Sequence, residues 1–294
     1  MPLIEKISIN NKVNKIIKAY NTQYTEFSSQ INIISKPNYE FFGEIDNQGL
    51  IEGFAIQKFK NKNILKGIFS KNILKGWCIL NYSKGDIYKG QFFNQKAEGF
   101  GEYHHQNGGI YLGYWENNLQ ENIGIEIWSD NSKYFGQYSK GKKEGIGTYL
   151  LSNGSIYKGE WKNNFIEGFG ILKYFDGKIY RGQWKNNLMW GYGEFIWNQE
   201  KKYYGFYKND KKDGFGIFKM KGNKIFVGFW KEGKQNGIGK YIKDNNIRYG
   251  IWKDGKKENK IFSEEEFINR FNSFEAKFIN IFQWNVDKIK NFMN

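Results

Sequence analysis

A repeat of 23 residues constrains the fold of this chain more than any other feature of its sequence. In residues 156–184, a tyrosine, a glycine and a tryptophan alternate with charged residues, and two further glycines follow a polar turn. The pattern begins again at Tyr180, 23 residues after Tyr157. The anchor positions, seven of whose nine steps have this length, are Phe41, Leu65, Tyr88, Tyr111, Tyr134, Tyr157, Tyr180, Tyr203, Phe226 and Arg248. Self-similarity at a fixed period of this size indicates a repeat architecture.

Each unit of the repeat predicts one β-hairpin. Tyr157, Gly159 and Trp161 alternate with charged residues, and this period of two is typical of a strand. Asn163–Asn164 suits a tight turn because asparagine tolerates positive φ, and Asp176–Gly177 supplies the return turn. We therefore expect an all-β repeat: an elongated, twisted, single-layer antiparallel meander of about ten β-hairpins, with flanking N- and C-terminal α-helices.

The chain divides into three predicted regions. Residues 1–38 form an N-terminal helical or extended segment, residues 39–262 form the array, and residues 263–294 form a C-terminal amphipathic helix. Ser263 and the three glutamates after it match a capping box. Phenylalanines then recur at helical spacing, and those expected to dock the helix are Phe267, Phe271, Phe274, Phe278 and Phe282. This helix either folds back over the exposed end of its own sheet or docks onto another subunit.

The recurring glycines and aromatics predict how the sheet is packed. A glycine inside a strand packs nothing of its own, so we expect aromatic rings to lie flat over the bare backbone beside them. Both faces carry ordered apolar rows, of which one substitutes for a core and the other forms an open aromatic groove. The repeat aromatics assigned to partner binding are Tyr111, Trp115, Tyr134, Tyr138, Tyr157, Trp161, Tyr180, Trp184, Tyr203 and Tyr207.

Lysines recur in the hairpin loops, and these loops should line up along one edge of the array. The chain has a formal net charge of +15. The lysine edge is either a solvated edge that prevents aggregation or a basic strip that contacts an acidic surface. The candidate contact residues are Lys96, Lys142, Lys143, Lys211, Lys212, Lys234 and Lys256.

The spacing Tyr-x-Gly-x-Trp, a polar turn and Gly-x-Gly resembles the MORN repeat (membrane occupation and recognition nexus), over about residues 39–262. The units that keep the spacing begin at Tyr88, Tyr157 and Tyr180, whereas the terminal units depart from it and Asn122 replaces a glycine. The resemblance implies an elongated hairpin ribbon used for protein association. MORN proteins occur in ciliary radial spoke heads, in division and cortical structures of protists, and at membrane junctions.

The sequence offers little for chemistry, so we expect no catalytic residue, no metal, no cofactor and no enzymatic activity. The single Cys78 excludes an intramolecular disulfide. His104 and His105 are adjacent on a strand and point to opposite faces, which makes them a poor joint pair of metal ligands. The recurring Gly-x-Gly lacks the strand–loop–helix context and the lysine of a phosphate loop.

Three classes of function follow. The first is a non-enzymatic structural scaffold of a cytoskeletal assembly, most plausibly a radial-spoke-like part of the ciliary axoneme, with other proteins of that complex as partners or with self-association. The alternative is a peripheral membrane tether that binds anionic phospholipid through the lysine edge. Nucleic-acid binding is the weakest, because the rings are committed to the glycine columns. Lacking a signal peptide and a long apolar run, the chain is expected in the cytoplasm, at the cytoskeleton or cilium.

Overall fold

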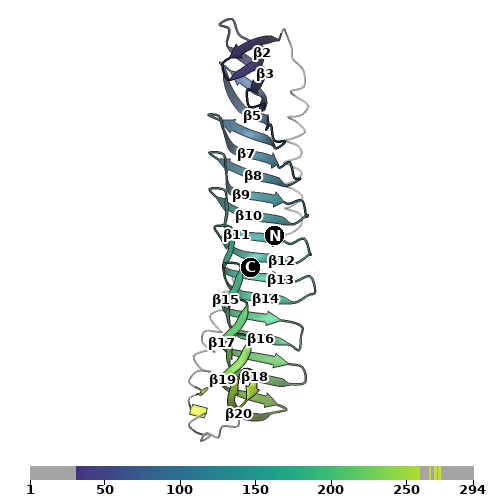
Figure 1. Cartoon of the computed structure of the whole chain (residues 1–294), viewed down its shortest axis with the longest axis vertical. Helices are drawn as coiled ribbons and strands as arrows, with labels where there is room; N and C mark the ends of the chain where they lie inside the picture. The colour runs from purple at the N-terminus through teal and green to yellow at the C-terminus, as the bar shows by residue number, and fades with distance from the viewer. Residues whose placement is uncertain (1–30, 259–264, 266–267, 270, 273–294) are drawn as a thin grey trace. The chain divides into compact units, whose positions relative to one another are not determined.

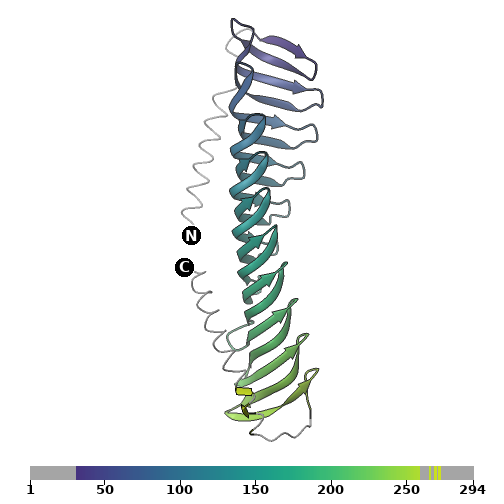
Figure 2. The same ribbon diagram turned by 90° about the vertical axis from the view of Figure 1, so that its left-hand side faces the viewer.

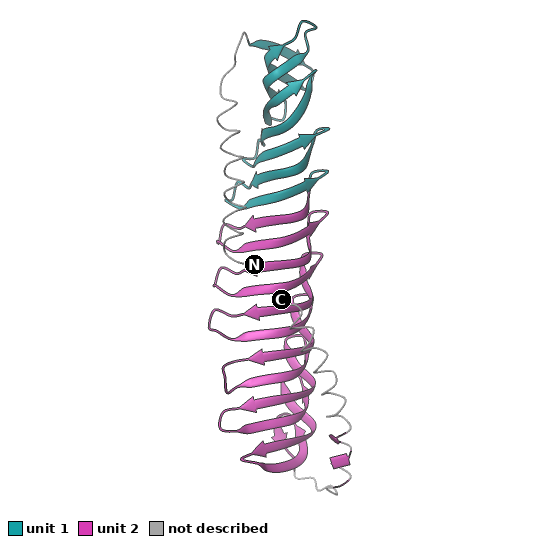
Figure 3. Cartoon of the chain, turned by 180° about the vertical axis from the view of Figure 1, so that it is seen from behind, with its two compact units in different colours: residues 1–119 teal, residues 120–294 magenta. Residues whose placement is uncertain are grey.

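The computed structural model describes residues 31–258, 265, 268–269 and 271–272, and it separates into two compact units, residues 1–119 and 120–294 (Figure 3). The strands of the first unit are β1 (Asn32–Lys36), β2 (Tyr39–Ile45), β3 (Ile51–Phe59), β4 (Ile64–Ser70), β5 (Ile73–Asn81), β6 (Ile87–Phe93), β7 (Lys96–His104) and β8 (Ile110–Glu116). Within this unit, each strand from β1 to β7 pairs antiparallel with the next strand in the chain.

The second unit continues the same pattern over thirteen strands (Figure 1). They are β9 (Leu119–Ile127), β10 (Lys133–Ser139), β11 (Lys142–Leu150), β12 (Ile156–Lys162), β13 (Phe165–Lys173), β14 (Ile179–Lys185), β15 (Leu188–Ile196), β16 (Lys202–Lys208), β17 (Lys211–Met220), β18 (Lys224–Lys231), β19 (Lys234–Lys243), β20 (Asn246–Lys253) and β21 (Lys256–Lys257). Every pair between successive strands is again antiparallel.

The predicted all-β hairpin meander is confirmed within each unit, and neither meander closes into a barrel. Figure 2 shows successive strands as neighbouring rungs. Ten hairpins would give twenty strands, which are β2 to β21 with the short β21 closing the tenth hairpin; the described chain has 21 because β1 precedes the predicted start of the array. No complete flanking helix lies in the described part. Residues 265, 268–269 and 271–272 have helical backbone, and the predicted N-terminal helix falls outside the described residues.

Two-residue turns at one edge are the predicted tight turns. Asn163 and Asn164 have φ of 50° and 70°, the pair of positive values that a type I′ hairpin turn requires. Most of these loops are also bonded to the preceding hairpin. The Asn164 Oδ1 atom accepts a hydrogen bond from the Lys143 amide at 2.7 Å, and the Asn163 amide donates to Glu144 Oε2 at 2.9 Å. The first bond recurs in Ile51–Asn72, Ala97–Asn118, Ile166–Asn187 and Met189–Asp210.

A β-bulge in most hairpins explains a second column of glycines. Three residues of β11, Glu144 to Ile146, lie opposite Gln137 of β10, and Gly145 there has φ of 70°. The Gln137 Oε1 atom accepts a hydrogen bond from the Ile146 amide at 2.7 Å, which satisfies a group that the bulge removes from the ladder. The same bond joins Gln91 to Phe100, Glu160 to Phe169 and Gln183 to Tyr192.

The anchor residues, apart from the exposed Arg248, form the buried row of the sheet, and we call the face that carries them the anchor face. The ring of Tyr180 lies over Gly182 and Gly193. A Cβ atom added to Gly182 would lie only 2.6 Å from the Tyr180 hydroxyl. That hydroxyl donates to the Gln183 carbonyl at 2.9 Å. The predicted stacking of rings over bare backbone is therefore confirmed. Equivalent hydroxyl bonds are made by Tyr88, Tyr111, Tyr134, Tyr157 and Tyr203.

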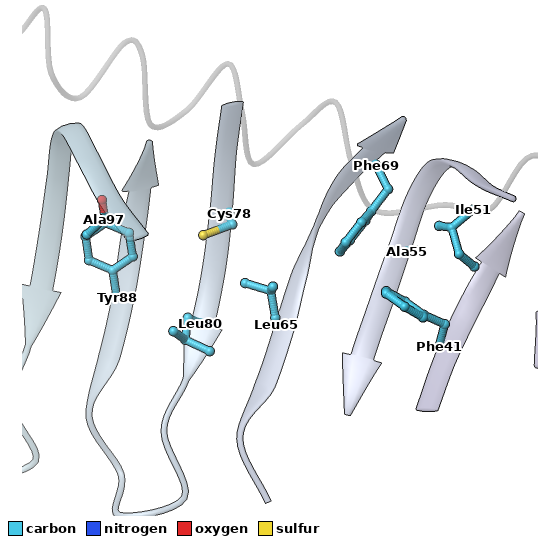
Figure 4. Packing of buried hydrophobic residues seen from close by; sticks show 9 residues of the cluster. All are labelled: Phe41, Ile51, Ala55, Leu65, Phe69, Cys78, Leu80, Tyr88 and Ala97. Carbon is cyan, nitrogen blue, oxygen red and sulfur yellow. The ribbon is translucent and has the colours of Figure 1, made fainter. Parts of the chain in front are cut away.

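In the irregular units at the N-terminal end of the array, substitutions at the anchor position are paired with substitutions at a glycine position (Figure 4). Leu65 replaces the anchor tyrosine, and Cys78, which pairs with Gly67 in the same hairpin, replaces a glycine. In the unit before, Phe41 lacks the hydroxyl, and Ala55 fills a glycine position. All four side chains are buried in one cluster. A smaller anchor is thus accompanied by a larger residue at the glycine position, which conserves packed volume.

Candidate interaction surfaces

The aromatics predicted to line an open groove are packed against one another. Nine of these ten side chains are at most 7% exposed, and only Trp115 is half-buried. Tyr157 contacts Trp161 and Trp184 edge-to-face with centroids 5.6 Å apart, the geometry that aromatic pairs prefer. In this structure they form the buried row of the anchor face, because each ring fills the space above a glycine. Their role in partner binding stays a prediction.

Two of the predicted contact lysines point into the anchor face. The Nζ atom of Lys212 lies 4.1 Å from the Phe218 centroid, 4.5 Å from Trp230, 4.9 Å from Tyr203 and 5.2 Å from Trp197. These four rings form an aromatic cage in which the ring faces attract the ammonium. Burial, with a contribution from Lys201, lowers the pKa of Lys212 to about 8. In the described part of the chain, no carboxylate pairs with it.

Lys143 occupies the corresponding place in its own hairpin. Its Nζ atom lies 4.7 Å from the Trp128 centroid and 2.7 Å from Glu126 Oε2. Glu126 also accepts a hydrogen bond from the Tyr138 hydroxyl at 3.0 Å. The assignment of Lys143 and Lys212 to the lysine edge is therefore wrong, because alternation along the strand turns them away from the exposed Lys142 and Lys211. The available signal was a cationic residue in a column that elsewhere holds only uncharged side chains in the preceding and intervening units, Leu74, Ala97, Gln120, Ile166 and Met189.

The other five lysines of the predicted strip are exposed on the loop edge of their own unit. Three of them bond to the loop of the next hairpin. Lys96 Nζ lies 2.8 Å from Asn117 Oδ1, Lys142 Nζ 3.2 Å from Asn163 Oδ1, and Lys211 Nζ 2.6 Å from Glu232 Oε2. Lys234 and Lys256 are the other two. These lysines help to tie successive loops together, and whether they contact an acidic surface stays a prediction.

The opposite face of the second unit, which we call the outer face, is covered at one end. Phe271 is fully buried there and clusters with Tyr192, Phe215 and Val227. Its ring centroid lies 5.9 Å from that of Phe215 and 6.4 Å from that of Tyr249. The C-terminal segment thus packs through Phe271 on its own sheet, over the face and not only the edge. The other predicted docking residues, Phe267, Phe274, Phe278 and Phe282, lie outside the described residues.

The outer face is open over strands β9–β12. We define the isoleucine patch by its exposed members, Ile123 (52% exposed), Ile146 (44%), Leu150 (36%) and Ile156 (41%). Between them lie the half-buried Ile125, Ile127 and Phe135. In the same column of the repeat, Phe169, Tyr192 and Phe215 are at most 6% exposed. These exposed apolar side chains make the patch a candidate contact site for another molecule.

Basic side chains surround the isoleucine patch. Lys133 pairs in register with Ile127 and Leu150, Lys158 with Thr148, and Lys173 with Ile156, which places all three lysines on the outer face. All three are exposed. The carboxylate of Glu160 on this face is bonded to the Phe169 amide. The surroundings of the patch therefore favour an acidic partner.

The groups with potential for chemistry are dispersed over the described residues. His104 contacts Glu102 on one face, whereas the ring of His105 packs against Tyr103, 4.8 Å away, on the other. The two histidines thus point apart, as predicted. Cys78 is buried, and burial raises its pKa to about 12. Within the described chain, no three His, Cys, Asp or Glu side chains gather as metal ligands, and no helix has the length and apolarity to cross a membrane.

The regular spacing of anchors, bulges and loops identifies the class of protein. The MORN repeat family matches seven segments, namely residues 88–110, 111–133, 134–156, 157–179, 180–199, 203–222 and 226–248. Because these segments make up more than half of the sequence, the chain belongs to the MORN-repeat proteins. The predicted family is confirmed, and such repeats are indicative of a protein-interaction or scaffold module.

Comparison with individual proteins adds little to the family assignment. Among curated proteins, no relative matches the sequence. The TCP10 domain of Danio rerio CPAP, solved with a STIL peptide, is 9% identical with a TM-score of 0.45, over 75% of this chain and 97% of that one. The TCP domain of Drosophila melanogaster SAS-4, solved with a proline-rich motif of Ana2, is 14% identical with a TM-score of 0.35, over 63% and 97%. Likeness this low carries no conclusion about partners.

Proposed function

We propose that the chain is a non-enzymatic scaffold that binds a partner protein through the isoleucine patch. The observation that carries this proposal is the contrast along one repeat column. Phe215 is covered by Phe271, whereas Ile123 and Ile146 are open although they belong to the same apolar column. Leaving apolar side chains in water forgoes about 25 cal/mol for each Å² that a partner would cover. A bound protein would remove that exposure.

The finer proposal places the chain in the cytoplasm, in a cytoskeletal assembly such as a radial-spoke-like part of the ciliary axoneme. Its support is the set of assemblies in which MORN proteins occur. Detergent extraction of the native cell tests it, because a structural component should stay with the insoluble cytoskeleton or axoneme. Complete release of the chain by detergent would contradict this location.

Proximity labelling in the native cell tests the scaffold function itself. The chain is compared with the double variant Ile123→Asp and Ile146→Asp, and with Ile73→Asp as the control, because Ile73 is 60% exposed in the other unit. We expect a defined set of proteins to lose its label in the double variant and to keep it in the control. The same labelled proteins in all three samples would refute the role of the patch.

A second candidate function, tethering to anionic phospholipid, is favoured by the exposed loop-edge lysines. An ammonium near a negative membrane surface gains about 1 kcal/mol, and salt screens this attraction. Flotation with phosphatidylserine vesicles should weaken when Lys142, Lys211, Lys234 and Lys256 are replaced by Gln, and should not change with Lys143→Gln. Flotation that is insensitive to both salt and these substitutions would exclude this function.

A further inference from the structure

The isoleucine patch has the geometry of a binding site for an amphipathic helix, an inference that rests on the proposed function and specifies its partner. Ile123 in β9 and Ile146 in β11 are separated by one hairpin, which at the usual strand spacing is about 9–10 Å. Seven residues of an α-helix rise about 10.5 Å. A helix that crosses the strands can therefore place an apolar side chain over each isoleucine, seven residues apart.

The chain itself provides the precedent for this mode of binding. Phe271 lies in a stretch with helical backbone and packs on the outer face against Phe215 and Tyr249. Phe215 occupies the same place in its hairpin as Ile146. The column thus accepts an aromatic side chain from a helix at its C-terminal end, and the isoleucine patch repeats that surface without a described residue over it.

The charges around the patch define the polar side of the ligand. Lys133, Lys158 and Lys173 are exposed beside the apolar residues. We propose that the patch binds a helix of another protein that has phenylalanine or leucine seven residues apart, with intervening apolar residues at helical spacing and acidic residues on its flanks. Apolar anchors at such positions are the general means by which a helix is held in a groove.

A peptide with the sequence of residues 263–294 is a suitable probe, because it carries Phe271 and phenylalanines seven residues apart. Fluorescence anisotropy measures its binding, with a label on the peptide, to the full chain. We expect saturable binding that weakens at least about tenfold in Ile123→Asp and in Ile146→Asp, and that is unchanged in Ile73→Asp. The side chains replaced are exposed, and circular dichroism checks that each variant retains its sheet.

A second peptide with Ala276→Pro tests the helical conformation, because proline in a helix interior costs about 3 kcal/mol. We expect its binding to be much weaker than that of the parent peptide. Equal binding of both peptides, equal binding to Ile146→Asp and the unchanged chain, or no binding at all would overturn the helix proposal. Labelled cellular proteins that still depend on Ile123 and Ile146 would then leave the scaffold function intact, with a different bound element.

Discussion

At the scale of single residues, each anchor tyrosine and its two glycines form one packing unit. Gly182 has no positive φ, so only the space above it demands glycine. An added Cβ would lie 2.5 Å from the Gly193 Cα atom and 2.6 Å from the Tyr180 hydroxyl. Neither group can move, because one is backbone and the other is a fully buried ring. Replacing Gly182 by alanine therefore tests whether the Tyr180 ring is the reason that this position is a glycine.

We predict that Gly182→Ala lowers the free energy of unfolding by about 1–3 kcal/mol, as expected of overpacking in a core. Urea denaturation followed by tryptophan fluorescence measures the change. Gly109→Ala is the control, because an added Cβ there meets no atom closer than 3.3 Å and Gly109 also lacks a positive φ. Equal stability of the two variants would mean that the Tyr180 ring can move aside.

The caged Lys212 predicts a pH dependence with a defined sign. Its pKa is about 8 in the folded chain and near 10.5 when unfolded, so the unfolded chain binds more protons between these values. Stability of the chain relative to Lys212→Met should therefore rise by about 1–3 kcal/mol from pH 8 to pH 10.5. Unfolding free energies of both proteins across this range give the difference, in which the tyrosines cancel.

The neighbouring Lys211 is a matched control for this measurement. A hydrogen bond and ion pair with Glu232 raise its pKa, so its stabilising contribution is complete below the unfolded pKa and is lost as the pH rises through the folded one. The difference between the parent and Lys211→Met should thus be nearly flat from pH 8 to about pH 10.5 and should fall above that pH, whereas the Lys212 difference rises within that range. A flat difference for Lys212→Met would show that its amine is solvated.

At the scale of the hairpin, the two-residue turn and its bond to the preceding hairpin can be separated. Asn164 has φ of 70° and accepts a hydrogen bond from the Lys143 amide. Asp210 occupies the same place with φ of 64° and accepts the same bond from Met189 at 2.7 Å. The chain therefore already contains an aspartate that performs both tasks of Asn164.

We predict that Asn164→Asp leaves stability within about 0.5 kcal/mol of the parent, whereas Asn164→Ala costs about 1–3 kcal/mol, because it loses the bond and strains the turn. Asn164→Gly should fall between them, since glycine retains the backbone conformation alone. Thermal unfolding of the four proteins gives the ranking. An alanine variant as stable as the aspartate variant would contradict this account.

The repeat spacing alone predicts the hairpins, their antiparallel order, the positive-φ turns and the rings over glycines, because each of these recurs in most units. The spacing does not predict features that depend on contacts among side chains from several strands. The cage around Lys212 needs rings from three different strands and a loop. The bond from Gln183 to the Tyr192 amide requires knowledge of the bulge. Phe206 and Phe229 take the glutamine position elsewhere, and the glycines opposite them, Gly214 and Gly237, have φ of 101° and 106° in place of 62–74°.

The candidate site shows the same limit. The sequence predicts the apolar column that includes Ile123, Ile146 and Phe215. The open groove, however, was assigned to the other apolar row, which consists of the anchor tyrosines and their neighbouring aromatics. Alternation places the two columns on opposite faces without saying which one is buried. Burial follows from the glycines, since a tyrosine that covers two of them is itself covered by the next tryptophan.

At the scale of the whole molecule, buried tyrosines dominate the response to alkali. Burial raises the pKa values of Tyr134, Tyr157, Tyr180, Tyr192, Tyr203 and Tyr207 above the ordinary value of 10.0. Above pH 10 the unfolded chain therefore loses protons that the folded chain retains, and stability falls.

We predict cooperative alkaline unfolding, in which tyrosinate absorbance and the loss of sheet circular dichroism share one midpoint. Each buried tyrosine adds up to about 1.4 kcal/mol per pH unit to the slope. A pH titration from 8 to 12 that monitors both signals tests this. Gradual ionisation of tyrosines in a chain that retains its sheet would contradict the burial of the row.

The bonds between successive loops have a consequence for how proteins of this kind change length. Each loop of the Asn164 type satisfies one amide of the hairpin before it and presents the same groups to the hairpin after it. A gene segment that encodes 23 residues can therefore be duplicated or deleted in register, and the new neighbours find their donors and acceptors in place. A single residue inserted within a strand would instead shift the donors and acceptors out of register with those of the neighbouring hairpin. Arrays of this class should accordingly vary among species by whole units, with surplus or missing residues confined to the turns.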